Sequence, residues 1–432
     1  MAYNADNKRK RGRIMKTDRF DVVIIGAGAA GVTAAISAGR AGASTLLVER
    51  YGTVGGGITT TYVRPFLGGV ANQNLGHELV QDITALTDRM STFESAKCVL
   101  IQKLSDAGVR VWLQTTLVDA EVSDGHISAI TLMAPGGKRR VEGKIFIDAS
   151  GDGNLSVMAG AEYDIGREGD RLIQPTSIMF TIEGIAPWQD LICEHEEDHQ
   201  MMAPGEDFLE LCHRACASGE LPSNINIIRL YKTEQPGERM VNATQCNYLD
   251  PLDPNQVFEA EVLLRGQVKL IVDFLRRHVP GYENIRVNGS SATLGIRESR
   301  RITGDYVLCE ADLFAGRKFP DAIVHNAGFC IDIHNPDGPG QAEHEEGRPP
   351  VEHPYDIPYA ALRPRGFDNL LTAGRCISGT HMAMASYRVM NICMAMGDAA
   401  GYAAAIAAKR TLTTRQVPVA EVQEYVHITP EV

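Results

Sequence analysis

The stretch that decides the fold is residues 21–49, which read DVVIIGAGAAGVTAAISAGRAGASTLLVE. Asp21–Ile25 is a short, β-branched apolar run, which predicts a buried parallel strand. A glycine-rich turn follows, and then an Ala-rich segment, Val32–Ala41, with helical periodicity. A second apolar run, Ser44–Val48, predicts another strand. The stretch therefore predicts the strand–helix–strand unit of an α/β domain.

The turn in this unit has the residues that a bound dinucleotide requires. Gly26 permits the tight turn, Gly28 lets the backbone approach a pyrophosphate, and Gly31 lets the helix pack on the strand. The helix N-terminus offers free N–H groups and a partial positive charge to the phosphates. Glu49 follows the second strand and is placed to accept hydrogen bonds from ribose hydroxyls, where it would repel a 2′-phosphate. The unit predicts a dinucleotide site; a glycine turn without a ligand is the alternative.

The residues after Glu49 distinguish FAD from NAD. Gly55–Gly57 and Thr59–Thr61 come next. Flavoproteins of the glutathione-reductase type have a Gly-Gly pair at this point, where the chain passes beneath the ribityl pyrophosphate. A simple NAD dehydrogenase normally continues directly into another helix. This resemblance favours FAD.

Two later strands end in glycine as further flavoprotein signatures do. The apolar strand at Lys144–Ala149 ends in Ser150–Gly153, with Ser where Thr is usual. Asn369–Arg375 is another strand that ends at glycine, and the Ala-rich helix Met390–Gly401 follows it. In this class of fold that helix directs its N-terminus at the flavin pyrimidine ring. The three signatures occur in the order that a flavoprotein requires.

The chain resembles the large bacterial group of FAD-dependent oxidoreductases that includes the flavin domain of heterodisulfide reductase. More distantly, it is similar to the fumarate-reductase-like flavoproteins. Beyond the signatures above, Gly295–Arg301 and Tyr355–Tyr359 carry the resemblance, which spans most of residues 18–410. It implies an α/β fold, with a discontinuous Rossmann FAD-binding domain of the glutathione-reductase type and an inserted α+β substrate domain.

The resemblance also implies domain boundaries and cofactor contacts. We expect the FAD-binding domain at residues 18–160 and 363–432, the substrate domain at 161–362, and a disordered extension at 1–17. Residues 110–113, 117–122 and 127–132 read as further strands. The predicted FAD contacts are Gly26, Gly28, Ala30, Gly31, Glu49, Arg50, Gly56, Gly57, Val118, Ser150, Gly151, Asp152, Gly374, Arg375 and Asn391.

Composition excludes several other classes of protein. The chain has 432 residues, 44% hydrophobic and 22% charged, which is enough to fill a large core. Its net charge of −12 gives it no general basic surface for nucleic acid. No apolar run reaches the roughly 18 residues that span a bilayer, and the basic start has no apolar segment after it. We therefore expect a cytoplasmic protein with no membrane or nucleic-acid partner. The chain has 42 glycines, about one residue in ten, against a usual share of about 7%. We expect the glycines of the signatures, together with Gly397, to let the backbone approach FAD closely.

The sequence predicts no metal site and no redox disulfide. The nine cysteines include no C-x-x-C pair, which excludes the usual zinc and iron–sulfur spacings. His195–His199 formally matches H-E-x-x-H, but acidic neighbours surround it as on a solvated helix. A second group of histidines and acids fits no ligand spacing, and it reads as a hydrated lid over residues 331–353 that could contain one catalytic histidine. That group is His325, His334, His344 and His353, with Asp332 and Asp337.

Candidate catalytic residues precede the helix that begins at Met390. We expect His381, Tyr387 and Arg388 to line the substrate cavity, since a chain approaching that helix must pass near the flavin. A histidine there could accept the substrate proton during hydride transfer. In the inserted domain, Val257–His278 predicts a long amphipathic helix and Ile285–Leu294 a strand. Arg297, Arg300 and Arg301 could hold an anion, but pairing with Glu298, Asp305 and Glu310 is favoured.

These observations predict an FAD-dependent oxidoreductase that exchanges a hydride between a small polar organic substrate and flavin N5. Oxygen or a separate carrier would be the external electron acceptor. The alternative is a flavoprotein subunit that passes electrons to a partner protein. A flavoprotein of tRNA modification is disfavoured by the acidic charge. Homo-oligomerisation and covalent attachment of the flavin both stay open.

Overall fold

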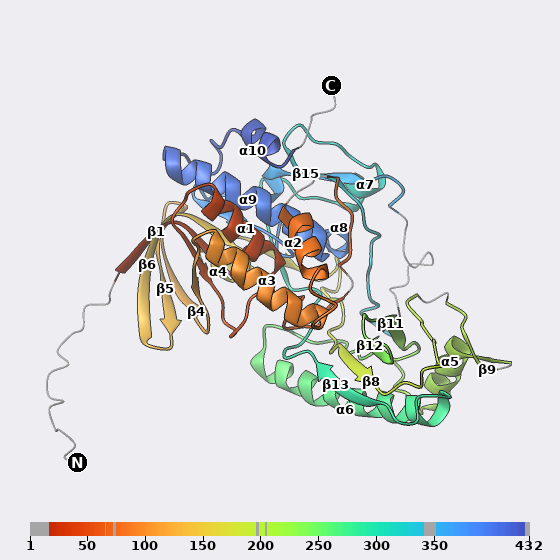
Figure 1. Ribbon diagram of the computed structural model, residues 1–432. Coiled ribbons are helices and arrows are strands. Elements are labelled where there is room, and N and C mark those ends of the chain that lie inside the picture. Colours follow the sequence, from red (N-terminus) through yellow and green to blue (C-terminus); the bar gives the residue numbers. More distant parts are fainter. Residues whose placement is uncertain are drawn as a thin grey trace, which may run out of the picture.

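The computed structural model describes residues 17–64, 66–71, 75–195, 198–203, 205–340 and 351–427. Residues 1–16 of the predicted extension lie outside this part of the chain, and Thr17 already begins the first strand. The described residues are organised around two main sheets. Figure 1 shows the larger sheet with its helices in red, orange and blue, and the smaller sheet in yellow-green and green.

The larger sheet has seven strands and brings the predicted signatures to one edge. In spatial order its strands are β3 (Arg110–Trp112), β2 (Thr45–Val48), β1 (Thr17–Ile25), β6 (Gly137–Asp148), β5 (His126–Ala134) and β4 (Thr116–Ser123), with β17 (Leu370–Thr372) pairing with β6 beside this row. β1, β2, β3, β6 and β17 run parallel, whereas β4, β5 and β6 form an antiparallel meander. The glycine turn, Glu49 and the two later glycine endings therefore follow the carboxyl ends of neighbouring strands. Ligands bind at this edge of doubly wound sheets.

Two helices with small residues pack closely on this sheet. They are α1 (Ala29–Arg40) and α9 (Met390–Arg410), which lie side by side in Figure 1. A Cβ added to Gly397 would lie 2.1 Å from the backbone oxygen of Ala30, and one on Gly401 would lie 2.1 Å from that of Ala34. The expectation that Gly397 admits FAD is therefore wrong, because it admits α1 instead. Thr33 Oγ1 strengthens the contact by donating to the backbone oxygen of Met394 at 2.9 Å.

The smaller sheet is antiparallel and has its own hydrophobic core. Its order is β11 (Arg229–Lys232), β12 (Glu238–Asn242), β8 (Phe180–Glu183) and β13 (Arg286–Ser290). α5 (Phe208–Ser218) and α6 (Pro254–His278) pack in this core, which extends from Ile178 to Leu294. α6 confirms the long helix predicted at Val257–His278. It begins three residues earlier because Asp253 caps it by accepting a hydrogen bond from the backbone N–H of Asn255.

The last part of the predicted inserted domain packs with the larger sheet. β15 (Ala322–Ala327) pairs with β16 (Tyr355–Pro358), and both contribute to the core that contains α1 and α9. The hydrophobic core around the larger sheet includes residues from Leu308 to Leu362. The chain therefore returns to the core of the larger sheet before the predicted domain boundary at 362. β7 (Tyr163–Ile165) and β14 (Arg300–Ile302) form a two-stranded sheet.

The remaining elements are short or peripheral. They are α2 (Leu75–Thr84), α3 (Thr92–Asp106), α4 (Asn154–Met158), α7 (Glu310–Phe314), α8 (His381–Tyr387), α10 (Val419–Tyr425), the 3₁₀ helix η1 (Tyr359–Leu362), β9 (Met201–Ala203) and β10 (Glu206–Asp207). Within the described ranges, no single helix has the length and hydropathy to cross a membrane. α8 and α9 reach that threshold only when taken together, and they are bent by 91° at their junction.

Candidate active site

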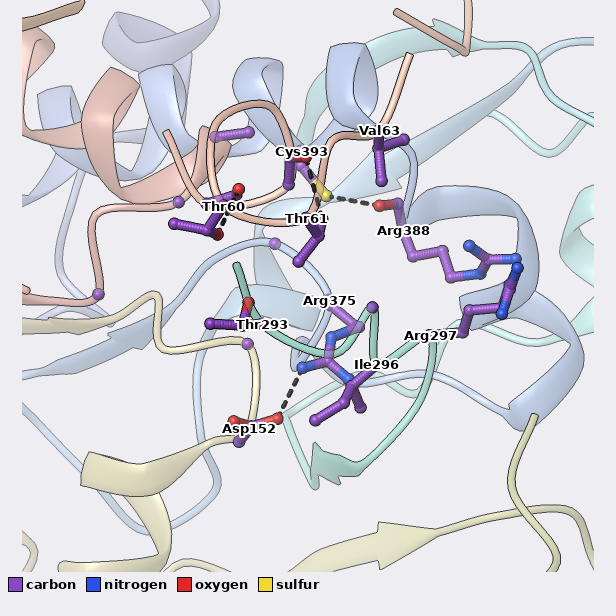
Figure 2. A pocket seen from close by; sticks show the side chains of 18 of the residues that line it. Thr60, Thr61, Val63, Asp152, Thr293, Ile296, Arg297, Arg375, Arg388 and Cys393 are labelled. Carbon is purple, nitrogen blue, oxygen red and sulfur yellow. Dashed lines mark hydrogen bonds and ion pairs between the residues drawn. The ribbon is translucent and has the colours of Figure 1, made fainter. Parts of the chain in front are cut away.

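A cavity of about 1310 Å³ is lined by residues of both sheets. Ile25 and Val48 come from the larger sheet, while Arg229, Tyr231 and Asn242 come from the smaller one. Pockets for small molecules usually measure roughly 300–1,000 Å³. This cavity therefore has room for a dinucleotide together with a second ligand. Figure 2 shows part of it from close by.

Most of the predicted cofactor residues line this cavity, as does one of the predicted catalytic residues. They are Gly26, Gly28, Ala30, Glu49, Arg50, Gly56, Gly57, Ser150, Gly151, Asp152, Gly374, Arg375 and Arg388. These residues come from segments far apart in the sequence. The structure thus brings the three predicted signatures to a single cavity.

The glycine turn has the geometry of a phosphate site. Gly26 has φ +96°, and an added Cβ would lie 2.5 Å from the backbone oxygen of Ala149. At Gly28 an added Cβ would meet no protein atom within 4 Å, so it would extend into open space. Gly28 is also the N-cap of α1, where no side chain caps the helix. An anion can therefore approach the first N–H groups of α1, and the fit with a dinucleotide pyrophosphate is good.

Glu49 holds the turn in addition to lining the cavity. Its Oε2 accepts a hydrogen bond from the backbone N–H of Ala27 at 2.7 Å, and its Oε1 accepts one from that of Tyr51 at 2.9 Å. The side chain is buried at the end of β2. Each carboxylate oxygen keeps a further lone pair for a ribose hydroxyl. The carboxylate thus fits both the predicted ribose contact and the shape of the loop.

Arg375 and Asp152 form an ion pair across the cavity wall. Arg375 Nη2 lies 2.6 Å from Asp152 Oδ1, as Figure 2 shows, and Ser299 Oγ donates to the same carboxylate at 2.8 Å. Burial alone would raise the pKa of Asp152, but the charges of Arg375 and Arg50 hold it below its usual value. Asp152 is therefore an ionised, paired group at neutral pH.

Three predicted cofactor residues do not line the cavity. A Cβ on Gly31 would lie 1.9 Å from the backbone oxygen of Gly26, so Gly31 serves the close packing of α1 on the turn. Val118 is 40% exposed, and Leu117 lines the cavity in its place. Asn391 Nδ2 donates to the backbone oxygen of Gly68 at 2.8 Å, which holds the loop around Gly68 against the start of α9.

His381 and Tyr387 also lie outside the cavity lining, contrary to expectation. His381 Nδ1 is 2.8 Å from Glu298 Oε2, and Glu298 is fully buried beside Arg301. Tyr387 donates its hydroxyl to the backbone oxygen of Ile377 at 3.1 Å, and burial raises the pKa of this phenol. Since α8 directs both side chains into internal contacts, only Arg388 of the three predicted catalytic residues reaches the cavity.

The three arginines of the Gly295–Arg301 segment have different environments. Arg301 pairs with Glu298 as predicted, whereas Arg300 Nε donates to the backbone oxygen of Asp152 at 2.8 Å. Asp305 and Glu310 are not their partners in the described structure: Asp305 pairs with Arg363 and Arg415, and Glu310 accepts a hydrogen bond from Thr380.

Arg297 lines the cavity, as Arg300 also does. Its one recorded hydrogen bond runs from Nη1 to the backbone oxygen of Pro175 at 2.8 Å. Burial, followed by the charge of Arg388, lowers the pKa of Arg297 to about 9. Figure 2 shows the guanidinium groups of Arg297 and Arg388 close together.

Sequence reasoning missed the residues that join Arg297 around this part of the cavity. Arg229, Asp332 and His334 line the same cavity, and all three are buried. Burial and then the charge of Arg297 lower the pKa of His334 well below its usual value, so its imidazole is neutral at pH 7. The only signal in the sequence was the density of histidines and acids around residue 334, which predicted a hydrated lid that could contain one catalytic histidine.

The other polar clusters have structural partners. His325 Nδ1 lies 2.9 Å from Asp356, and His199 Nδ1 lies 3.3 Å from Asp207. His344 falls in the 341–350 segment, and Glu196 and Glu197 fall in another undescribed segment. Within the residues that the structure describes, no group of three or more His, Cys, Asp or Glu side chains is arranged to hold a metal ion.

Comparisons with known proteins agree with a flavin site. The sequence model of the family "FAD dependent oxidoreductase" matches residues 21–426. Digeranylgeranylglycerophospholipid reductase 2 of Methanothermobacter thermautotrophicus is 26% identical over 164 residues, which are 33% of this chain and 43% of that enzyme. The match thus spans less than half of the curated relative.

The chain also has a weak likeness to several solved structures. A geranylgeranyl bacteriochlorophyll reductase-like protein from Thermoplasma acidophilum is 12% identical, with a TM-score of 0.48 over 95% of this chain and 84% of its own. The flavin-dependent brominase Bmp2 is 12% identical, with a TM-score of 0.47 over 95% and 84%. Since the family model matches nearly the whole chain, this protein belongs to the FAD-dependent oxidoreductase family, and its cofactor is FAD.

Proposed function

We propose that this enzyme exchanges a hydride between a small polar organic substrate and flavin N5. The observation that carries the proposal is the single cavity that extends from the glycine turn of the larger sheet to polar side chains of the smaller one. At the glycine turn the cavity exposes bare backbone beside paired charged groups, and near the smaller sheet it is lined by charged side chains that include Arg297. Such a cavity can hold a cofactor and a substrate together.

The cofactor region would hold FAD through residues of the larger sheet. We assign the pyrophosphate to Gly28 and the N-terminus of α1, and the adenosine ribose to Glu49. Gly56 and Gly57 line the same region. We also propose the finer assignments made from sequence: a glutathione-reductase-type domain, a relation to the heterodisulfide reductase flavin domain, and a substrate domain built around the smaller sheet. Bound FAD supplies the atom that accepts or donates the hydride.

His334 replaces His381 as the proposed proton acceptor. It lines the cavity, it is neutral at pH 7, and its Nε2 lies 3.8 Å from Asp332 Oδ2. A neutral imidazole can take the proton that a substrate hydroxyl or amine loses when its carbon loses hydride. Glu298 already engages Nδ1 of His381, which lies outside the cavity lining.

The test is an anaerobic screen of metabolites with the FAD-loaded protein, followed by flavin absorbance. We expect at least one small polar compound to bleach the flavin. His334→Asn should slow flavin reduction at least about tenfold. His381→Asn should reduce its flavin at the rate of the unmodified protein, when the rate is expressed per bound FAD. Bleaching by a partner protein and by no metabolite would support the electron-transfer alternative and overturn the proposal.

A further inference from the structure

Three arginines from distant segments share one part of the cavity. Arg229 lies on β11, Arg297 follows β13, and Arg388 lies between α8 and α9. The strongest charges acting on Arg297 are those of Arg388, Asp332 and Arg229. His334 is neutral there, so it adds no charge to this group.

We propose that this cluster is a binding site for an anionic group of the substrate, so that the enzyme acts on an organic acid whose carboxylate is bound by Arg297 with Arg229 and Arg388. The inference rests on the proposed function, because it concerns the second ligand of the same cavity. Guanidinium groups bind carboxylates through paired, charge-assisted hydrogen bonds.

The first support is the charge balance at Arg297. Its recorded hydrogen bond is to a backbone oxygen, and no ion pair with a carboxylate is recorded for it among the described residues. A guanidinium that is removed from water and placed beside two other arginines is electrostatically unfavourable. Its lowered pKa reflects the same cost. A bound anion would remove this cost, because it supplies the missing negative charge.

The second support is a pair of buried donors without acceptors. Arg388 Nη2 reaches Asp332 Oδ2 at 3.2 Å and the backbone oxygen of Asp332 at 2.8 Å. Within the described residues, however, Nε of Arg388 has no hydrogen-bond partner. Gln174 is similar: its Oε1 accepts from Arg388 and from the backbone N–H of His334, but its Nε2 has no partner in the same part of the chain. Unpaired buried donors call for an acceptor-rich ligand.

The third support is the contrast with the neighbouring arginines. Arg301 is paired with Glu298 and Arg375 with Asp152. The positive charge of these residues is therefore already balanced by the protein. Arg297 has no such carboxylate partner among the described residues, and the Asp332 carboxylate near it also pairs with Arg388.

The test uses the FAD-loaded protein and two matched series of probes. Acetate, succinate and malate are compared with acetamide, succinamide and malamide by flavin difference spectra and by thermal shift. We expect at least one carboxylate to give a saturable response and its amide to give none. Arg297→Met should weaken that carboxylate about 10- to 100-fold. Arg297→Lys should weaken it less, and the FAD content should not change.

Arg286→Met is the matched control, because Arg286 is an exposed arginine on β13 that pairs with Glu183. It should bind the carboxylate as the unmodified protein does. Arg229→Lys provides a second variant if Arg297→Met does not fold. Equal binding of acids and amides, no response to any carboxylate, unchanged affinity in the Arg297 variants, or loss of FAD in Arg297→Met would each overturn the proposal. Failure of hydride transfer would instead refute the proposed function, since anion binding is scored without turnover.

Discussion

Two arginine sites in one cavity differ in how their charge is balanced. Arg375 faces Asp152 at 2.6 Å, so the protein itself neutralises it. Arg297 donates to a backbone oxygen, and the strongest charge acting on it is the positive charge of Arg388, which Asp332 opposes only in part. A paired arginine such as Arg375 therefore stabilises the protein around the cofactor. An arginine in excess marks the region where a ligand must supply the opposite charge.

The largest expected effect comes from a substitution in the cofactor region of the cavity. In Gly28→Val the new side chain meets no protein atom at its Cβ but extends into the cavity where we place the pyrophosphate. The fold should remain, and FAD affinity should fall at least about 100-fold. Fluorescence titration of the apoprotein with FAD measures the loss. Gly136→Val is the control, because an added Cβ is equally unobstructed there and Gly136 does not line the cavity.

The next prediction compares the two arginines directly. Arg375→Met removes the positive charge that balances the buried Asp152 carboxylate. It should therefore lower the free energy of unfolding by about 3 kcal/mol. Arg297→Met removes an unbalanced charge and should change it by less than about 1 kcal/mol, or raise it. Urea unfolding of the two apoproteins decides. Equal losses in both variants would remove the distinction between paired and excess arginines.

A smaller effect concerns the pH dependence of stability. The folded state keeps His334 neutral, whereas an unfolded histidine takes up a proton as the pH falls below about 6.5. The unfolded state then binds more protons, so stability must decrease on acidification. From about pH 7.5 to about pH 5.5, this group should cost about 1 kcal/mol. His334→Gln should reduce the acid-dependent loss by that amount in urea unfolding, and an unchanged pH profile would contradict the burial of a neutral His334.

The smallest effect tests two neighbours on β4. Val118 is exposed, while Leu117 lines the cavity. Val118→Ala should change FAD affinity by less than about twofold, whereas Leu117→Ala should weaken it about fivefold. The same FAD titration measures both variants. A larger effect of Val118→Ala would restore the original prediction that this residue contacts the cofactor.

The cofactor region was largely predictable from sequence because its requirements are local. Gly26 and Gly28 belong to one turn that is recognisable within thirty residues, and Glu49 ends the strand that follows. At the two glycines the backbone itself makes the tight turn and approaches the ligand, and glycine is the residue that allows this conformation. The parallel strands and the strands β4 and β5 of the meander were predictable for the same reason, since their patterns are continuous in the chain.

The substrate region was not predictable, because long-range packing assembles it. Arg229, Arg297 and His334 meet only after the smaller sheet and the chain beyond it have folded against the larger sheet. His381 was chosen for its position close to α9, but α8 directs it toward Glu298. The direction of a side chain on a short helix depends on its tertiary partners, which spacing does not reveal.

The close packing of α1 on α9 has a consequence for protein synthesis. The ribosome makes α1 well before α9, yet Ala30 and Ala34 pack directly against Gly397 and Gly401. Until α9 has been made, the face of α1 that contains Ala30 and Ala34 therefore lacks its partner. Gly374 and the start of α9 also line the cavity. The flavin pocket is thus completed only after the start of α9 has been translated, so a nascent chain that ends before α9 has an incomplete FAD site.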